Sequence, residues 1–218
     1  MEQHGRRIGI MGGTFDPVHI GHLMLAEHAR EQYELELVYV MPNGTPAYKS
    51  DHTVTDATVR MEMTSLAIEN NPGFELSAVE VERAGNTYTY QTLEYLREEN
   101  PETQYFFIIG ADSLFHFETW KEPQIIADNC VLLLANRNRT AREELDAQIQ
   151  LLHRRYGADI RHLDCPDIAI SSEMIRARVR QGKSIRYYVP DAVADYIAQH
   201  DLYNTHMEAI RNGDDSDA

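Results

Sequence analysis

A glycine-rich segment between an apolar run and a helix-forming run constrains this chain most. It reads GGTFDPVHIGH over residues 12–22. The run before it, 7–11, is apolar and typical of a buried strand, whereas 23–29 has helix formers at apolar spacing. A strand, a tight loop and a helix N-terminus are therefore predicted in that order. Because the first turn of a helix offers unpaired N–H groups and a partial positive charge, this junction favours a bound phosphate.

The alternation of strand-like and helix-like runs continues along the chain. Strands are predicted near 7–11, 35–41, 74–81, 105–109, 130–134 and 158–163, and helices near 20–33, 56–70, 89–100, 120–128 and 141–156. This pattern predicts an α/β fold, a Rossmann-like doubly wound parallel sheet that binds ligands at the carboxyl ends of its strands. Two further helices, near 172–181 and 191–199, predict a small C-terminal helical cap.

The chain of 218 residues is 43% hydrophobic, and no linker rich in Pro, Gly or Ser divides it. We therefore predict one domain over residues 1–205, with a helical subregion at about 165–205. Residues 206–218 read as an acidic tail.

Charge and hydropathy exclude several classes of protein. The formal net charge of −15 argues against non-specific nucleic-acid binding, which needs a basic surface. No apolar stretch approaches the roughly 20 residues that span a membrane, and the N-terminus lacks a signal-peptide core. We therefore predict a cytoplasmic protein with no membrane partner. Cys130 and Cys165 are far apart and are predicted to be reduced packing residues.

Basic residues concentrate late in the chain. Residues 137–186 hold eleven Lys plus Arg against seven Asp plus Glu, although the whole chain is acidic. A local anion site is one interpretation, and a solvated helix face is the interpretation we prefer for Arg142, Arg154 and Arg155.

His19 and His22 are three residues apart and are predicted to share one face of the first helical turn. Two interpretations compete: phosphate contact, and a metal site completed by Asp16. A catalytic zinc would need a third ligand with a plausible second shell, and it would leave the Gly-Gly and Phe-Asp-Pro elements unexplained. We therefore favour the histidines as phosphate donors.

The segment GGTFDPVHIGH resembles the long form of the H-x-G-H signature of nucleotidylyltransferases, in the version found in bacterial nicotinate mononucleotide adenylyltransferases. Later segments resemble the same family in order and at compatible spacing, so the resemblance extends from residue 8 to about 200. It implies transfer of an adenylyl group from ATP to nicotinate mononucleotide, giving deamido-NAD and pyrophosphate in NAD biosynthesis. It also implies the sheet with a helical cap.

The loop MPNGTPAYK, residues 41–49, resembles the P-N-x-x-P-P-H-K loop of the family, with Lys49 in register. Ala47 and Tyr48 replace proline and histidine, which puts one nucleotide contact in doubt. A tyrosine hydroxyl could replace one hydrogen bond, and an ordinary surface turn is the alternative interpretation.

Two segments resemble the acceptor side of the family's site. The run ERAGNTYTYQTL, residues 82–93, places Thr89 as a helix N-cap, in a corner that receives the nicotinate carboxylate in the family. Capping alone would also explain Thr89. Trp120, the one tryptophan, follows FIIGADSL and suits stacking on a cationic pyridinium ring, although a core role is the alternative. Asp112 could accept hydroxyl protons from a ribose.

The run ISSEMIRAR, residues 170–178, resembles the I-S-S-T-x-I-R element of the family. Its serines can cap a helix, and Arg176 lies one turn further along, suited to the triphosphate of ATP. Glu173 replaces the usual threonine, and we expect its side chain to turn away from phosphate.

The resemblance, taken residue by residue, implies a full set of contacts. Catalytic roles fall on His19, His22, Lys49 and Arg176. ATP contacts fall on Gly12, Gly13, Thr14, Phe15, His19, His22, Gly110, Asp112, Arg137, Ser171, Ser172 and Arg176. Mononucleotide contacts fall on Asn43, Tyr48, Lys49, Tyr88, Thr89 and Trp120. No protein metal ligand is expected, and Mg²⁺ is expected to accompany ATP, held by triphosphate oxygens and water.

Other functions remain open at this stage. Nicotinamide mononucleotide or another phosphomonoester is the nearest alternative acceptor. Phosphopantetheine adenylyltransferases and cytidylyltransferases fit less well, because they leave the Tyr88-Thr89 and Trp120 segments unexplained. A non-catalytic nucleotide sensor and a zinc-binding module are alternatives of other classes. The sequence leaves the oligomeric state open, a homo-oligomer included.

The histidines yield a first prediction. The phosphate of a mononucleotide is mostly dianionic at neutral pH and needs no general base, so His19 and His22 should stabilise charge by donating hydrogen bonds. We expect His19→Ala or His22→Ala to lower kcat on the order of 10²- to 10³-fold while ATP affinity changes much less. Pyrophosphate release and ATP titration measure the two quantities, and wild-type turnover in either variant would contradict this role.

Overall fold

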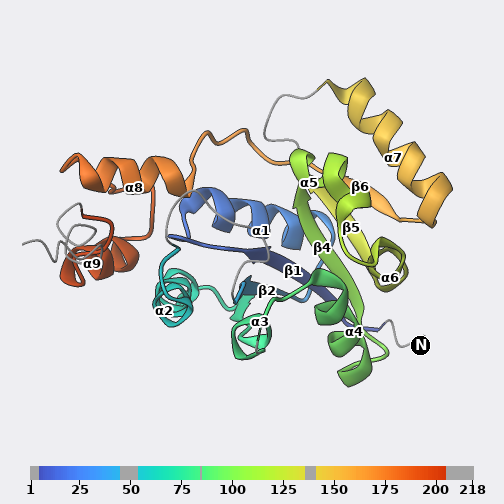
Figure 1. Ribbon diagram of the computed structural model, residues 1–218, viewed down its shortest axis with the longest axis horizontal. Helices are drawn as coiled ribbons and strands as arrows, with labels where there is room; N and C mark the ends of the chain where they lie inside the picture. The colour runs from blue at the N-terminus through green and yellow to red at the C-terminus, as the bar shows by residue number, and fades with distance from the viewer. Residues whose placement is uncertain (1–4, 45–53, 84, 136–140, 205–218) are drawn as a thin grey trace, which may run out of the picture.

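A computed structural model describes residues 5–44, 54–83, 85–135 and 141–204. In these ranges six parallel strands form one sheet in the order β3-β2-β1-β4-β5-β6 (Figure 1). The strands are β1 (Arg7–Gly13), β2 (Leu37–Pro42), β3 (Phe74–Leu76), β4 (Gln104–Gly110), β5 (Cys130–Ala135) and β6 (Ile160–Leu163). The predicted Rossmann-like α/β fold is confirmed. Strand order reverses between β1 and β4, where such sheets bind ligands.

Helices connect the strands and extend beyond the last one. They are α1 (Ile20–Gln32), α2 (Ala57–Ile68), α3 (Val79–Glu82), α4 (Thr89–Glu99), α5 (Ala111–His116), α6 (Pro123–Asn129), α7 (Arg142–Tyr156), α8 (Ser172–Arg180) and α9 (Asp191–Gln199), with a 3₁₀ turn η1 (Phe117–Thr119) after α5. Helices α8 and α9 lie at the end of the molecule opposite α6 and α7 (Figure 1), and α9 packs against α2. Within the described ranges, no helix is both long enough and apolar enough to cross a membrane.

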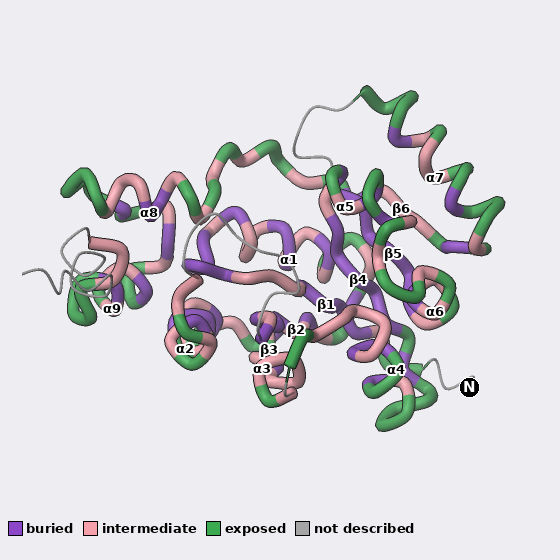
Figure 2. Tube along the Cα trace, viewed as in Figure 1, coloured by how far each residue is buried: buried purple, intermediate pink, exposed green. Residues whose placement is uncertain are grey.

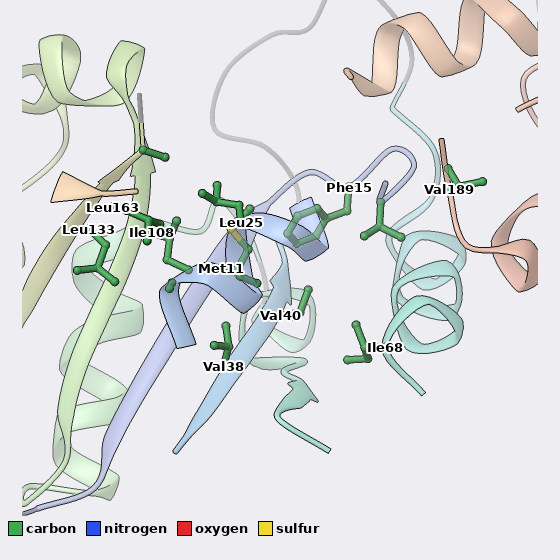
Figure 3. Packing of buried hydrophobic residues seen from close by; sticks show 14 of the residues in the cluster. Met11, Phe15, Leu25, Val38, Val40, Ile68, Ile108, Leu133, Leu163 and Val189 are labelled. Carbon is green, nitrogen blue, oxygen red and sulfur yellow. The ribbon is translucent and has the colours of Figure 1, made fainter. Parts of the chain in front are cut away.

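Both faces of the sheet are buried, which explains why its strands are apolar at successive positions. On β5, Val131 and Leu133 belong to one hydrophobic cluster, whereas Leu132 and Leu134 belong to the other. Figure 2 shows the central strands buried along most of their length. The first cluster continues from the sheet through Phe15 to Val189, so the C-terminal region shares a core with the sheet (Figure 3).

Two segments differ from the sequence-based expectation. The strand predicted over 74–81 ends at Leu76, and residues 79–82 form the short helix α3. This strand is at the edge of the sheet and pairs with β2 over three residues, so little holds a longer strand there. Helix α5 was not predicted, and it begins directly after Gly110 at the end of β4.

Candidate active site

A cavity of about 1270 Å³ opens at the carboxyl ends of β1 and β4. Its wall is formed by the end of β1, the first turns of α1, the turn before α4, the start of α5 and the segment before α8. Of the predicted site residues, it is lined by Gly12, Gly13, His22, Asn43, Tyr88, Thr89, Gly110, Asp112, Trp120 and Ser171. Residues from both halves of the sheet, distant in sequence, thus face one space.

The two histidines occupy the start of α1. His19 is the N-cap, with an extended backbone (φ −146°, ψ 167°), and its N–H donates to Nδ1 of His22 over 3.3 Å. The two rings stack, with centroids 3.6 Å apart. Because Nδ1 of His22 accepts this bond, the neutral ring carries its proton on Nε2 and is a donor there. His22 lines the cavity, whereas His19 is 2% exposed and lies behind it.

Thr14 and Phe15 follow β1 but do not line the cavity. Phe15 is buried in the same hydrophobic cluster as Val189 (Figure 3). Its ring meets that of His22 edge-on, with centroids 4.9 Å apart. Its ATP contact therefore stays a prediction, and the structure gives it a supporting position under the His22 ring.

The carboxylate of Asp16 holds the loop between β1 and α1. It is 1% exposed and accepts hydrogen bonds from the backbone N–H of Thr55 (3.2 Å) and the hydroxyl of Tyr203 (2.7 Å). Within the described residues, no group of three His, Cys, Asp or Glu side chains is arranged to hold a metal ion.

Helix α8 is hydrogen-bonded to the same loop. Nη1 of Arg176 donates to the carbonyl of Asp16 over 2.7 Å, and Oγ of Ser172 donates to the carbonyl of Pro17 over 2.8 Å. Arg176 is 9% exposed and neither residue lines the cavity. Their predicted ATP contacts stay predictions. Ser171 does line the cavity, and it caps α8 as expected by accepting from the N–H of Met174.

Arg60 is a site-building residue that the sequence reasoning missed. It is 1% exposed on α2 and donates to four backbone carbonyls and one side-chain amide. The acceptors are the carbonyls of Thr55, Thr14, Asn43 and Gly44 and Oδ1 of Asn43, at 2.7 to 3.2 Å. A single arginine in a helix otherwise rich in apolar residues was the available signal.

The loop after β2 is held tightly against α3. A Cβ atom at Gly44 would lie 2.4 Å from the carbonyl oxygen of Glu80, so glycine is required there. Asn43 lines the cavity, and its Nδ2 donates to Oγ1 of Thr14 over 3.3 Å. The predicted mononucleotide contacts Tyr48 and Lys49 of this loop, and the predicted ATP contact Arg137, lie outside the described residues.

The opposite wall carries the predicted acceptor residues. The N-cap of α4 is Tyr88, not Thr89 as expected: Tyr88 has the extended backbone and accepts from the N–H of Gln91. Trp120 lines the cavity and also packs on Phe117, with centroids 5.7 Å apart. The core and ligand interpretations of Trp120 are thus compatible.

Charged side chains lie close to this wall. Nζ of Lys121 lies 4.5 Å from the ring centroid of Tyr88, and Lys121 is the one Lys or Arg among the described lining residues.

Glu173, on α8, is exposed and does not line the cavity, consistent with the expectation that its side chain turns away from phosphate.

Glu80 also lines the cavity and was not anticipated, because residue 80 was predicted to be in a strand. Its Oε1 accepts from Oγ1 of Thr92 over 2.9 Å. Burial raises the pKa of the Glu80 carboxyl above its usual 4.5, against the hydrogen bond from Thr92 and the charge of Arg83. The wall therefore contains a carboxyl group whose ionisation is opposed by burial.

The parallel α/β sheet and the cavity at the carboxyl ends of its strands are typical of the nucleotide-binding class of α/β proteins. The family model of cytidylyltransferase-like proteins matches residues 10–178. The chain is 43% identical over 198 residues to a protein of Lachnoclostridium phytofermentans named probable nicotinate-nucleotide adenylyltransferase, covering 91% of this chain and 99% of that protein. A protein of Moorella thermoacetica with the same name is 41% identical over 210 residues, covering 94% of each chain.

Solved structures agree on the fold. The nicotinic acid mononucleotide adenylyltransferase of Plasmodium falciparum, complexed with APC, superposes with a TM-score of 0.72 at 20% identity and covers 91% of this chain and 97% of its own. The chain thus belongs to the cytidylyltransferase-like class and, within it, to the nicotinate-nucleotide adenylyltransferase family.

Removing the Arg60 side chain should destabilise the fold strongly. Arg60→Ala leaves several buried carbonyls without their donor, and each such group costs about 1–3 kcal/mol. We expect the free energy of unfolding, measured by urea denaturation, to fall by about 3 kcal/mol or more. Arg154→Ala, at an exposed position of α7, is the matched control and should change stability by less than about 0.5 kcal/mol. A loss below about 1 kcal/mol for Arg60→Ala would contradict the account.

Glu80 should make stability depend on pH. A carboxyl whose pKa is raised on folding binds its proton more tightly in the folded state, so stability is lost as pH rises above about 4.5. Glu80→Gln cannot ionise and keeps an oxygen for Thr92. We expect its Tm to gain on that of the wild type between about pH 4 and pH 7. Glu98→Gln, on the exposed face of α4, controls for net charge, and a constant Tm difference for Glu80→Gln would contradict the assignment.

Proposed function

We propose that this protein transfers the adenylyl group of ATP to the phosphate of nicotinate mononucleotide, releasing pyrophosphate and deamido-NAD. One observation carries the proposal. A single cavity joins the His22 end of α1 to the wall formed by Tyr88, Thr89 and Trp120. The two ends suit the two parts that the reaction brings together. The start of α1 suits the reacting phosphates, and the far wall suits the aromatic, cationic ring of the acceptor. The P. falciparum relative in fold was also solved with NaAD.

The reaction needs positioning and charge stabilisation more than proton transfer. A phosphate oxygen of the mononucleotide forms a bond to the α-phosphorus of ATP, and the bond from that phosphorus to the bridging oxygen of the β-phosphate breaks. Pyrophosphate leaves with the electron pair. Nε2–H of His22 would donate to an oxygen of the α-phosphate, where negative charge changes during transfer. The dipole of α1 would add a partial positive charge at its first turn, where the N–H groups of Ile20 and His22 donate to the carbonyls of Tyr188 and His19.

The far wall would select the acceptor. The ring of Trp120 offers a flat face to the pyridinium, and the α4 N-terminus after Tyr88 offers N–H groups to a carboxylate. Lys121 adds a positive charge on the same wall. Together these features favour nicotinate over the neutral nicotinamide.

Mg²⁺ is part of the proposal and rests on the chemistry of the substrate. This hard dication binds triphosphate oxygens and water with few protein ligands, and it would neutralise charge on the leaving pyrophosphate. The cytoplasmic location also stays a proposal.

Pyrophosphate release from ATP with each mononucleotide tests the function. We expect turnover with nicotinate mononucleotide and a kcat/KM at least about tenfold lower with nicotinamide mononucleotide. Exchanging the carboxylate for an amide loses a hydrogen bond to a charged group, which contributes about 1.5–3 kcal/mol. Replacing ATP by CTP is the control for the donor. ATP binding without turnover on either mononucleotide would favour a nucleotide sensor, and equal kcat/KM values would contradict selection of the acid.

A further inference from the structure

The loop between β1 and α1 leads into the helix that carries His22, the histidine lining the cavity, and the loop is held by hydrogen bonds from residues outside the cavity. Asp16 is buried, and both of its carboxylate oxygens accept hydrogen bonds from distant segments: Oδ2 from the N–H of Thr55 and Oδ1 from the hydroxyl of Tyr203. Tyr203 lies 187 residues further along the chain. The end of the described chain thus reaches the loop that precedes His19.

The fold fixes Tyr203 in place. Its backbone adopts the left-handed region (φ +66°), which is uncommon for a residue with a side chain. Its hydroxyl also lies 3.9 Å from the sulfur of Met63 on α2. Burial, and then the neighbouring charge of Asp16, raise the pKa of Tyr203 well above its usual range, so the hydroxyl remains a donor near neutral pH.

We propose that Tyr203 is a positioning residue of the active site: its hydroxyl holds the Asp16 carboxylate and thereby fixes the loop that orients His19 and His22. A hydrogen bond between a hydroxyl and a carboxylate is short and stronger than one between neutral groups, so it can hold a loop in one geometry. A misplacement of about 1 Å at the reacting groups can cost on the order of 10²-fold in rate. The C-terminal segment therefore completes the site without touching substrate.

The chain contains a matched control for this bond. The hydroxyl of Tyr196, on α9, donates to the carboxylate of Glu62 on α2. This bond also joins the C-terminal region to the rest of the fold through a tyrosine and a carboxylate, but it is exposed and its acceptor lies on α2, not in the loop that holds Asp16. Tyr196→Phe therefore removes the same kind of bond away from the site.

The proposal rests on the proposed function, so the wild-type enzyme is assayed first with ATP and nicotinate mononucleotide. Absence of wild-type turnover overturns both the proposed function and the positioning role that rests on it, whereas wild-type turnover with equal kcat in the two variants overturns the positioning role alone. With turnover established, we expect Tyr203→Phe to lower kcat on the order of tenfold or more, while KM for ATP stays within about threefold. Tyr196→Phe should retain kcat within about twofold.

Stability is measured on both variants, because a purely structural role would lower Tm and leave kcat unchanged well below Tm. Equal kcat for Tyr203→Phe and Tyr196→Phe under such conditions overturns the proposal. Asp16→Asn is the second variant, and it serves if Tyr203→Phe does not fold: wild-type kcat in a folded Asp16→Asn protein also overturns the proposal. In the double variant, the two losses of kcat should be less than additive in free energy, because both break one bond.

Discussion

The guanidinium group of Arg60 maintains the region where the sheet stops and the site begins. The pairing of β1 with β2 ends at Gly13 and Pro42, with one further bond from the N–H of Asn43 to the carbonyl of Gly13. Beyond that point no ladder satisfies the backbone, and Arg60 donates to the carbonyls of Thr14 and Gly44 instead. Buried carbonyls need such donors, so the two loops that border the cavity depend on one side chain from α2.

The motif at residues 12–22 contains residues with two different roles. Gly12, Gly13 and His22 face the cavity, whereas Asp16 is buried and bonded to other elements. Helix α8 contributes in both ways: Ser171 lines the cavity, and Arg176 holds the Asp16 carbonyl. Neighbouring residues of one motif therefore need not share a role, because the backbone turns between them and directs some side chains into the cavity and others into the protein interior.

The sequence predicted the sheet well because its strands are buried on both faces and read as continuous apolar runs. It failed where local pattern was weak. Residues 77–82 look like a strand continuation, but the edge strand β3 pairs with one neighbour only, and α3 forms instead. The same error hid Glu80 from the sequence analysis. The N-cap of α4 was misplaced by one residue because Tyr88 and Thr89 are both compatible with a helix start, and backbone geometry selected Tyr88.

The sequence by itself determined the α/β class, the strand, glycine-rich loop and helix of the opening motif, and the family to which the chain belongs. These follow from local patterns, namely apolar periodicity, a glycine turn and a histidine pair on one helical turn. The tertiary structure decided which residues face the cavity and which hold them in place. Arg60, Glu80 and Tyr203 have hydrogen-bond partners as far as 46, 12 and 187 residues away, respectively. Such contacts depend on how the helices pack on the sheet, and no local pattern encodes that packing.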